Sequence, residues 1–286
     1  MTFRQRHLAL PVVVAIVAGC IAPLAVLVAF SFYEVEDFDL IPAFSFRAWG
    51  DLATSTTDWF LIGKAVLSGV ATTVFTALLG FPVALALTRL AASAKGLAII
   101  VLLTPLYTGE IVRIYAWRIV LGGEGLVNTL LLALGLIDEP LKFLLFSPFT
   151  IGLVLTYNNL PFMVLAIWVS AEMVDRRLIE AARDLGARPV DAFFRVIFPL
   201  TTPGLAAGSL TVFALSAGEM LTPSLLGGTS GATAMALVDN LFGTAFDWPL
   251  ASALALALLA TLFLVASAMA GLLLRLKGAR AVIGRA

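Results

Sequence analysis

The sequence predicts an all-α integral membrane protein with six transmembrane helices. Of its 286 residues, 61% are hydrophobic, and the mean hydropathy is +1.04. A helix crosses a bilayer with about 20 apolar residues, and six such stretches occur while little polar sequence is left over for a soluble catalytic domain. Residues 1–286 are therefore predicted to form a single transmembrane domain. The predicted spans are 8–32, 60–88, 97–121, 148–171, 203–226 and 249–276.

The basic residues are distributed unevenly between the two sets of loops. Most of the 18 Lys and Arg residues lie before the first span, after the sixth, or between spans two and three and spans four and five. The other side holds only Arg47, Lys64 and Lys142, and the loops there are rich in Asp and Glu. The positive-inside rule therefore places both termini and the segment between spans four and five in the cytoplasm.

The first two spans are ordinary membrane helices in composition. Span one contains Cys20 in a setting similar to a lipoprotein cleavage site, but its apolar run continues through Phe30, which favours an uncleaved anchor. Cys20 is the only cysteine, so an internal disulfide is excluded. Span two is rich in Ala, Gly, Ser and Thr, which permit close helix packing in lipid.

Span three carries an unusual number of polar and aromatic residues. Tyr107, Glu110, Arg113 and Trp117 fall in a segment that is expected to be largely buried. Ionisable groups at membrane depth are costly and face a cavity or one another. Glu110 and Arg113 are three residues apart, so an internal ion pair is the alternative to a role in a solute path. Residues 126–136 beyond it are expected to form a short interfacial helix.

Span four holds Asn158 and Asn159 beside Pro161. Adjacent amides next to a helix-disrupting proline indicate either hydrogen bonds between helices or the lining of a polar cavity. With a rise of 1.5 Å per residue, Asn158, Glu110 and Glu219 are compatible with one layer of a core about 30 Å thick.

Span five combines a small-residue face with an isolated acid. Gly204 and Gly208 are four residues apart, which is the spacing of close helix contacts in membranes. Glu219 has no basic residue within four positions on either side. Because a buried carboxylate without a partner pays a desolvation cost, Glu219 requires either a cationic solute or a structural role as a cap or hydrogen-bonded carboxyl.

The segment 175–203 is the one long charged and amphipathic interruption of the apolar sequence. Asp175 is a suitable cap for a helix, and Gly186 is suited to end that helix in a left-handed turn. Pro189 is well placed as the first residue of a second short helix. The pattern indicates a cytoplasmic docking elbow for a partner protein, and a helix pair lying on the membrane surface is the alternative. One helix face is formed by Leu178, Ala181, Ala182 and Leu185.

The same segment resembles the EAA loop of ABC importer permeases, in which EAA is followed by three residues, Gly, nine residues and Ile-x-Leu-Pro. The matching residues are Glu180-Ala181-Ala182, Gly186 and Pro199, while Val196 and Phe198 replace the Ile and Leu of the pattern. The resemblance implies a coupling helix that inserts into a groove on a cytoplasmic ATPase dimer. It also implies a second permease subunit, an external solute-binding protein and a bacterial inner-membrane location. The implied coupling residues are Glu180, Ala181, Ala182, Asp184, Gly186, Pro189 and Pro199.

Two further segments resemble the spermidine/putrescine permease branch of this family. They are Arg113–Trp117 with Gly125–Asn128, and Gly218–Pro223 with Gly227-Gly228. The resemblance implies polyamine transport, and carboxylates with aromatic rings suit polyamines through ion pairs and cation–π contacts. Iron, opines and other small solutes remain alternatives. The candidate residues of the substrate path are Glu219, Glu110, Tyr107, Asn158, Asn159 and Trp117.

The chain itself is predicted not to be an enzyme and to bind no cofactor, since it lacks the Gly-x-x-x-x-Gly-Lys-Ser/Thr loop that cradles phosphates. ATP would be used by the partner ATPase. Gly228–Gly231 is similar to the nucleophile motif of rhomboid proteases, but the only histidine, His7, is expected on the other side of the membrane. One His and one Cys are too few for the usual His and Cys metal sites, and no metal is predicted. An ion-coupled transporter acting alone is the remaining alternative; membrane lipid, not nucleic acid, is the expected environment.

Overall fold

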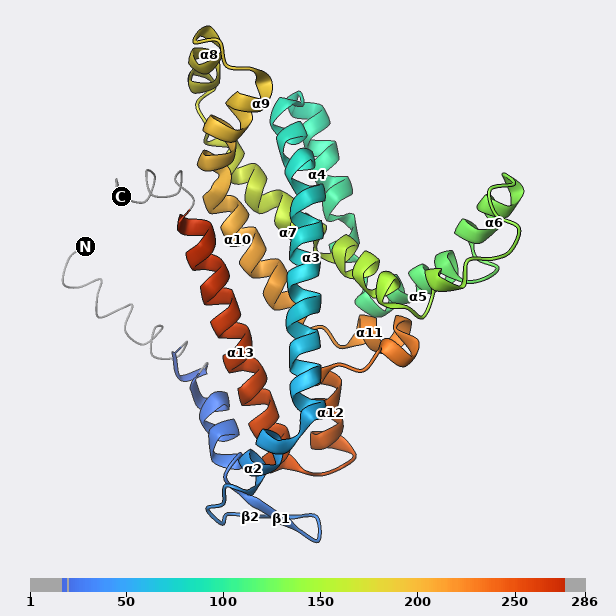
Figure 1. Ribbon diagram of the computed structural model, residues 1–286, viewed down its shortest axis with the longest axis vertical. Helices are drawn as coiled ribbons and strands as arrows, with labels where there is room; N and C mark the ends of the chain where they lie inside the picture. Colours follow the sequence, from blue (N-terminus) through green and yellow to red (C-terminus); the bar gives the residue numbers. More distant parts are fainter. Residues whose placement is uncertain (1–16, 20, 276–286) are drawn as a thin grey trace, which may run out of the picture. The chain divides into compact units, whose positions relative to one another are not determined.

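The computed structural model describes residues 17–19 and 21–275 (Figure 1). His7, Cys20, both termini and the beginning of the predicted first span lie outside the described residues. The rest of that span is helical over residues 21–30. The chain divides into two compact units, one drawn from residues 1–62 and 234–261 and the other from residues 63–233 and 262–286.

The first unit contains a β-hairpin within one of the acidic loops, and the sequence analysis did not predict it. Its strands pair antiparallel with Val35 opposite Leu40, and Asp37 and Phe38 at the turn have positive φ angles of 51° and 64°. Two residues with positive φ are typical of the tight turns that join such strands. The elements of this unit are helical residues 21–30, β1 (Glu34–Glu36), β2 (Asp39–Ile41), α2 (Arg47–Thr54), the start of α3 (Thr56–Arg89), α12 (Ala234–Gly243) and the start of α13 (Trp248–Arg275).

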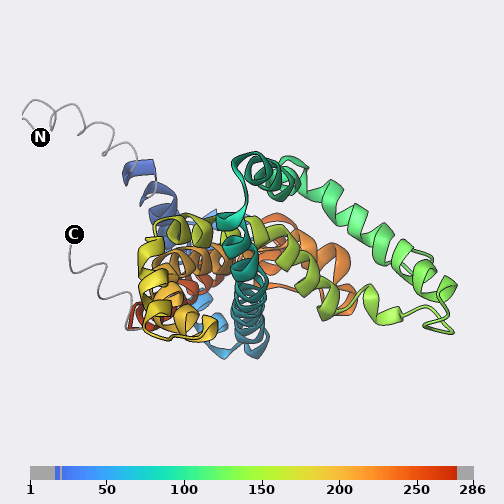
Figure 2. The same cartoon turned by 90° about the horizontal axis from the view of Figure 1, so that it is seen from above.

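The second unit is entirely helical within its described residues, and Figure 2 shows the chain leading away from α4 through α5 and α6 before it returns to α7. Its elements are the rest of α3 and α13, α4 (Ala92–Tyr107), α5 (Glu110–Leu121), α6 (Leu126–Ala133), η1 (Lys142–Leu144), α7 (Pro148–Glu172), α8 (Arg176–Asp184), α9 (Pro189–Ala192), the π-helical turn η2 (Phe193–Ile197), α10 (Phe198–Ala217), α11 (Leu221–Leu226) and η3 (Gly228–Ser230).

The described residues contain four helices that are long and apolar enough to cross a membrane, or five if one bent pair counts as a single span. Spans two, four and six of the sequence analysis match α3, α7 and α13 to within a few residues. The all-helical membrane fold is thus confirmed, while six spans and cytoplasmic termini stay predictions.

Spans three and five are broken, which corrects the sequence analysis. The predicted third span divides into α4 and α5 at Thr108-Gly109, and the pair bends by 98°. The predicted fifth span begins earlier, at Phe198, and its long helix ends at Ala217. The residues up to 226 form the separate helix α11, because the backbone amides that would have continued α10 are bonded by the Glu219 side chain instead.

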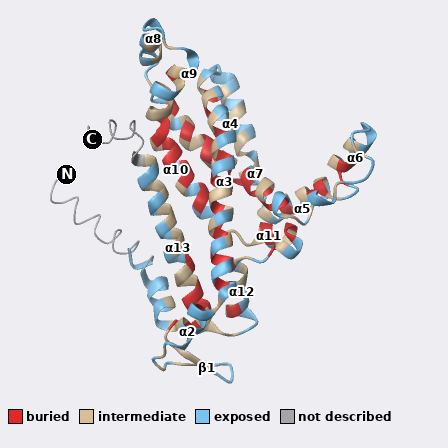
Figure 3. Ribbon diagram, viewed as in Figure 1, coloured by how far each residue is buried: buried red, intermediate tan, exposed pale blue. Residues whose placement is uncertain are grey.

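Helices α7 and α10 pack at close range through the small-residue face predicted for span five. A Cβ on Gly204 would lie 2.6 Å from the Ser170 Cβ, and a Cβ on Gly208 would lie 2.9 Å from the Met163 sulfur. Glycine therefore sets the separation of these helices. The buried side chains beside this contact belong to Ala84, Leu87, Met163, Val164, Ile167, Leu205 and Val212 (red in Figure 3).

Replacing Gly204 with alanine is expected to lower stability by about 1–3 kcal/mol, because the added methyl group forces the two helices apart. The melting temperature of the purified protein in detergent measures this effect. Gly152→Ala is the matched control, since a Cβ on Gly152 in α7 meets no atom within 4 Å. Equal melting temperatures for the two variants would show that α7 and α10 can move apart without a loss of stability.

Candidate functional site

The first helix of the elbow, α8, begins and ends as its sequence predicts. The Asp175 carboxylate accepts a hydrogen bond from the Arg177 amide at 2.9 Å and caps the helix start. At the other end, Gly186 has a φ of +83°, and the Ala187 amide donates to the Ala182 carbonyl at 3.0 Å. This six-to-one hydrogen bond around a left-handed glycine is the Schellman motif, so Gly186 defines where α8 stops.

No residue of α8 is buried, and the predicted docking face is uncovered. Leu178 is 50% exposed, and Leu185, just beyond the helix, is 89% exposed. The acidic residues Glu180 and Asp184 are also exposed (pale blue in Figure 3). An amphipathic helix usually buries its apolar face against another element, but α8 has no buried residue, and only Ile179 and Ala182 are partly covered.

The second half of the elbow runs directly into a membrane helix. Pro189 is at the start of α9, as predicted, and the chain continues through the π-helical turn into α10 with Pro199 in its first turn. Residues 198–203, which the sequence analysis placed in the loop, are therefore helical. The Phe193 ring lies 5.4 Å from the Phe81 ring on α3, edge to face, so this turn is packed against the membrane helices. Sequence reasoning missed this contact, since it joins residues far apart in the chain.

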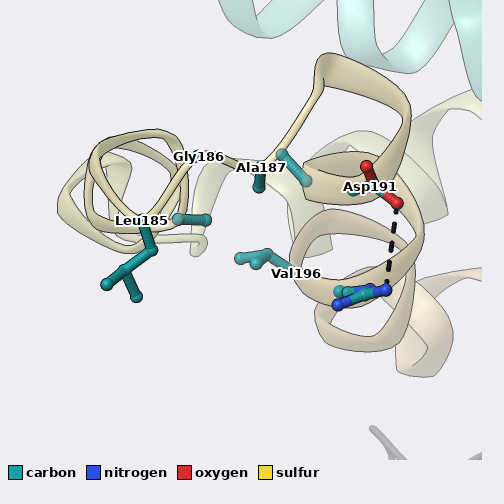
Figure 4. A pocket seen from close by; sticks show the side chains of 8 residues that line it. Leu185, Gly186, Ala187, Asp191 and Val196 are labelled. Atoms are coloured by element: carbon teal, nitrogen blue, oxygen red, sulfur yellow. Dashed lines mark ion pairs between the residues drawn. The ribbon is translucent and has the colours of Figure 1, made fainter.

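A hollow of about 340 Å³ lies between the two halves of the elbow (Figure 4). Asp191 and Arg195 face each other along its wall at 4.0 Å, one helical turn apart. Gly186 and Ala182 expose backbone and small side chains at the opposite side, which allows another surface to approach closely. The lining residues are Ala182, Leu185, Gly186, Ala187, Asp191, Ala192, Arg195 and Val196.

The root of the elbow is fixed by a polar cluster that sequence reasoning also missed. The Lys95 ammonium lies 2.6 Å from the Glu172 carboxylate, which also accepts a hydrogen bond of 2.9 Å from the Trp168 indole. Lys95 is near the start of α4, and Glu172 is the last residue of α7. The end of α7, three residues before the elbow, is therefore tied to the beginning of α4.

The break between α4 and α5 is stabilised by Arg113. Its guanidinium donates a 2.5 Å hydrogen bond to the Pro105 carbonyl, one of the last acceptors of α4. The ion pair with Glu110 that the spacing allowed is not among the ion pairs of the described residues. One end of the Arg113 guanidinium bonds to the backbone, and its Nε has no partner among the described residues, so the Glu110 carboxylate at the start of α5 is left for another partner.

That partner is Glu219, at the second helix break. The Glu219 carboxylate accepts hydrogen bonds from the Leu221 amide at 2.9 Å and the Thr222 amide at 3.2 Å, so it caps α11. The Glu110 carboxyl lies close enough to the Glu219 carboxyl for the two acids to interact electrostatically. We call Glu110 and Glu219 the acidic pair.

The two asparagines of α7 have different surroundings. The Asn159 amide donates to the Leu155 carbonyl at 2.9 Å and to the Ser216 hydroxyl at 3.2 Å, which ties α7 to α10. The Asn158 carbonyl oxygen is buried and has no hydrogen-bond partner among the described residues. The sequence left hydrogen bonding between helices and the lining of a polar cavity as alternatives. Asn159 makes the hydrogen bond between helices, whereas the carbonyl oxygen of Asn158 is an unsatisfied acceptor.

The two aromatic candidates for the substrate path, Trp117 and Tyr107, differ in how far they are packed against other residues. The Trp117 ring packs edge to face on the Tyr157 ring of α7, at 5.2 Å, and borders a cluster formed by Ile114, Val154 and Leu226. Tyr107, at the end of α4, is 88% exposed. No group of three or more His, Cys, Asp or Glu side chains suited to hold a metal occurs in the described part of the chain.

Proteins similar to this chain are bacterial transport permeases, although no family model matches it. The chain is 36% identical over 196 residues to a spermidine/putrescine transport system permease protein, PotB, of Haemophilus influenzae, covering 67% of this chain and 66% of that protein. PotB of Escherichia coli K12 is 37% identical over 180 residues, covering 63% of this chain and 65% of that protein. The molybdenum transport system permease protein ModB of Mycobacterium bovis is 32% identical over 192 residues, covering 65% of this chain and 69% of that protein.

Solved structures share the fold. A chain of a bacterial ABC transporter involved in the import of the acidic polysaccharide alginate superposes with a TM-score of 0.72 at 15% identity, covering 96% of both chains. A chain of a bacterial alginate ABC transporter in complex with an alginate pentasaccharide-bound periplasmic protein gives a TM-score of 0.70 at 16% identity. The arrangement of helices is thus that of an ABC-transporter membrane subunit. With the sequence relatives, this makes the chain a member of the ABC transporter permease family.

Proposed function

We propose that the chain is the permease subunit of an ATP-driven importer in the bacterial inner membrane, and that its solute is a polyamine such as spermidine or putrescine. The names of the PotB relatives support this solute class. Because the chain spans slightly less than two thirds of those relatives, the chemistry of its own residues carries the rest of the argument.

The acidic pair is the observation that carries the proposal. Glu110 and Glu219 stand at the starts of α5 and α11, where two helices are interrupted. In membrane transporters, interrupted helices commonly border solute sites, because unpaired backbone groups and helix ends are tolerated there. A protonated amine that reaches both carboxyls can pair with each of them. An anionic solute at this place would gain no such pairing from the two acids.

The elbow is the proposed contact with a cytoplasmic ATPase dimer. Its exposed apolar residues, acidic residues and close-approach surface suit insertion into a groove of a soluble partner, and the positive-inside rule favours the cytoplasmic side for it. The coupling role is proposed for Glu180, Ala181, Ala182, Asp184, Gly186, Pro189 and Pro199. Tight packing of Phe193 on Phe81 would pass movement of the elbow to α3.

Two other partners complete the proposed assembly. A second, homologous permease subunit would enclose the solute path from the other side, and an external solute-binding protein would deliver the polyamine. The solved alginate transporter in complex with a periplasmic protein supports such a delivery partner in this fold.

The experiment that tests this function is purification of the chain from its native membrane followed by uptake assays in proteoliposomes. An ATPase subunit should co-purify, and uptake of labelled spermidine should require ATP hydrolysis inside the vesicle. Uptake that persists without any ATPase would favour an ion-coupled transporter. ATP-dependent uptake of an iron complex or an opine in place of spermidine would keep the class and change the solute.

A further inference from the structure

Helix α11 is too short to be stable by itself, yet it presents half of the acidic pair. It has six residues, Leu221–Leu226, whereas isolated helices of fewer than about 12 residues are marginal in water. Its start is held by the Glu219 cap. Leu226 packs in the buried cluster with Ile114 and Val154. The third support of α11 is whatever holds the chain at its other end.

The chain after α11 forms a tight glycine turn over residues 227–231. The Gly227 amide donates to the Pro223 carbonyl at 2.8 Å, and the Gly231 amide donates to the Gly228 carbonyl at 3.0 Å. A Cβ on Gly231 would lie 2.5 Å from the Pro223 carbonyl oxygen, so only glycine fits there. The turn is thus hydrogen-bonded directly to α11, so a displacement of the turn also displaces the helix.

A lysine from another helix holds this turn. The Lys64 ammonium on α3 donates to the Ser230 carbonyl at 2.5 Å and to the Ala232 carbonyl at 2.6 Å. Hydrogen bonds with a charged donor are stronger than neutral ones. Lys64 forms none of the ion pairs found among the described residues, so its contacts to this turn are the ones the structure gives it.

We propose that Lys64 is a positioning residue for solute recognition: by fixing residues 230–232 to α3, it holds α11 and its capping Glu219 beside Glu110. This inference rests on the proposed function of the acidic pair. Lys64 does not itself contact the solute. Without the ammonium, the turn is free to move away from α3, and the two carboxyls lose the spacing that lets one amine pair with both.

Lys64→Met tests the proposal, since methionine keeps an unbranched side chain but has no donor. In proteoliposomes that contain the complete transporter, the spermidine concentration for half-maximal uptake is expected to rise about tenfold, as for the loss of a charged hydrogen bond. Lys64→Arg keeps the charge and donors and should recover most of the affinity. Lys142→Met is the matched control, because it removes one exposed lysine from η1.

Hydrogen exchange separates positioning from a general loss of structure. In Lys64→Met, amide exchange is expected to accelerate in residues 221–232 and to stay unchanged in α8. Unchanged exchange and unchanged half-maximal concentration would overturn the proposal. Faster exchange with unchanged spermidine affinity would also overturn it, because the tie would then not position the acidic pair.

Two further measurements keep the test decisive. If Lys64→Met does not accumulate, the wild-type transporter still reports on the turn that Lys64 holds. The Ser230 and Gly231 amides, which donate to the Gly227 and Gly228 carbonyls, should exchange slowly despite the short turn, and exchange at the rate of an unstructured peptide would refute a turn fixed by Lys64. Glu219→Gln measured in parallel distinguishes a failure of the acidic pair as the solute site from a failure of the Lys64 contact. No effect of Glu219→Gln on spermidine affinity would reject the acidic pair as the solute site, while slow exchange of the turn would still support the Lys64 contact.

Discussion

Gly186→Val is expected to uncouple transport from ATP hydrolysis. Gly186 has a φ of +83°, a conformation that a β-branched residue adopts only at a cost of about 1–3 kcal/mol. A Cβ at this position meets no atom within 4 Å, so the effect comes from the backbone alone. Because no buried contact holds α8 in place, the strain is relieved by moving the end of the helix, and the docking face loses its shape.

Spermidine-stimulated ATP hydrolysis by the reconstituted transporter measures this loss, and we expect a decrease of about tenfold, the equivalent of about 1.4 kcal/mol. Gly186→Asn is the matched control, since asparagine tolerates the left-handed conformation better than other residues with a Cβ. It should retain most of the activity. The membrane helices lie outside the affected turn, so the amount of folded protein should not change.

Glu180→Arg probes the same surface without altering the backbone. Glu180 is exposed on α8, and the structure gives it no ion pair among the described residues. Charge reversal should therefore leave the fold intact and weaken association with the ATPase in co-purification. Full coupling in both Gly186→Val and Glu180→Arg would reject the elbow as the docking element.

The elbow could be predicted closely from the sequence because its signals are local. The Asp175 cap, the left-handed Gly186 and the first-turn Pro189 each act within a few residues of their own position. The extents of α3, α7 and α13 also followed from hydropathy, since the length of an apolar stretch determines whether it can cross a bilayer.

The helix breaks could not be predicted, because they depend on competition between hydrogen bonds. Hydropathy is continuous through Thr108 and through Gly218. Nevertheless, α4 ends where the Arg113 guanidinium bonds to the Pro105 carbonyl, and α10 ends where the Glu219 carboxylate accepts the amides that follow it. The Lys64 and Phe81 contacts were missed for another reason: their partners lie more than 100 residues away in the chain. For Glu219, the sequence left a cap and a solute site as alternatives, and the geometry allows both at once.

Glu219→Gln separates these two roles, and it is expected to raise the spermidine concentration for half-maximal uptake at least about tenfold. The glutamine carbonyl can still accept the Leu221 and Thr222 amides, so the cap of α11 is preserved. What disappears is the negative charge that pairs with an amine, and charged hydrogen bonds contribute about 1.5–3 kcal/mol. The maximal rate at saturating spermidine should fall less than the affinity.

Four companion variants determine the interpretation of Glu219→Gln. Glu110→Gln should produce a loss of similar size, and the double variant should lose less than the two losses combined, because one amine is expected to pair with both carboxyls. Glu124→Gln removes an exposed acid between α5 and α6 and should leave uptake unchanged. Glu219→Ala removes both charge and cap, so it should also lower the melting temperature, by an amount equivalent to about 1 kcal/mol. If Glu219→Gln takes up spermidine like the wild type while Glu219→Ala is destabilised, Glu219 is a helix cap only, and the cation path lies elsewhere.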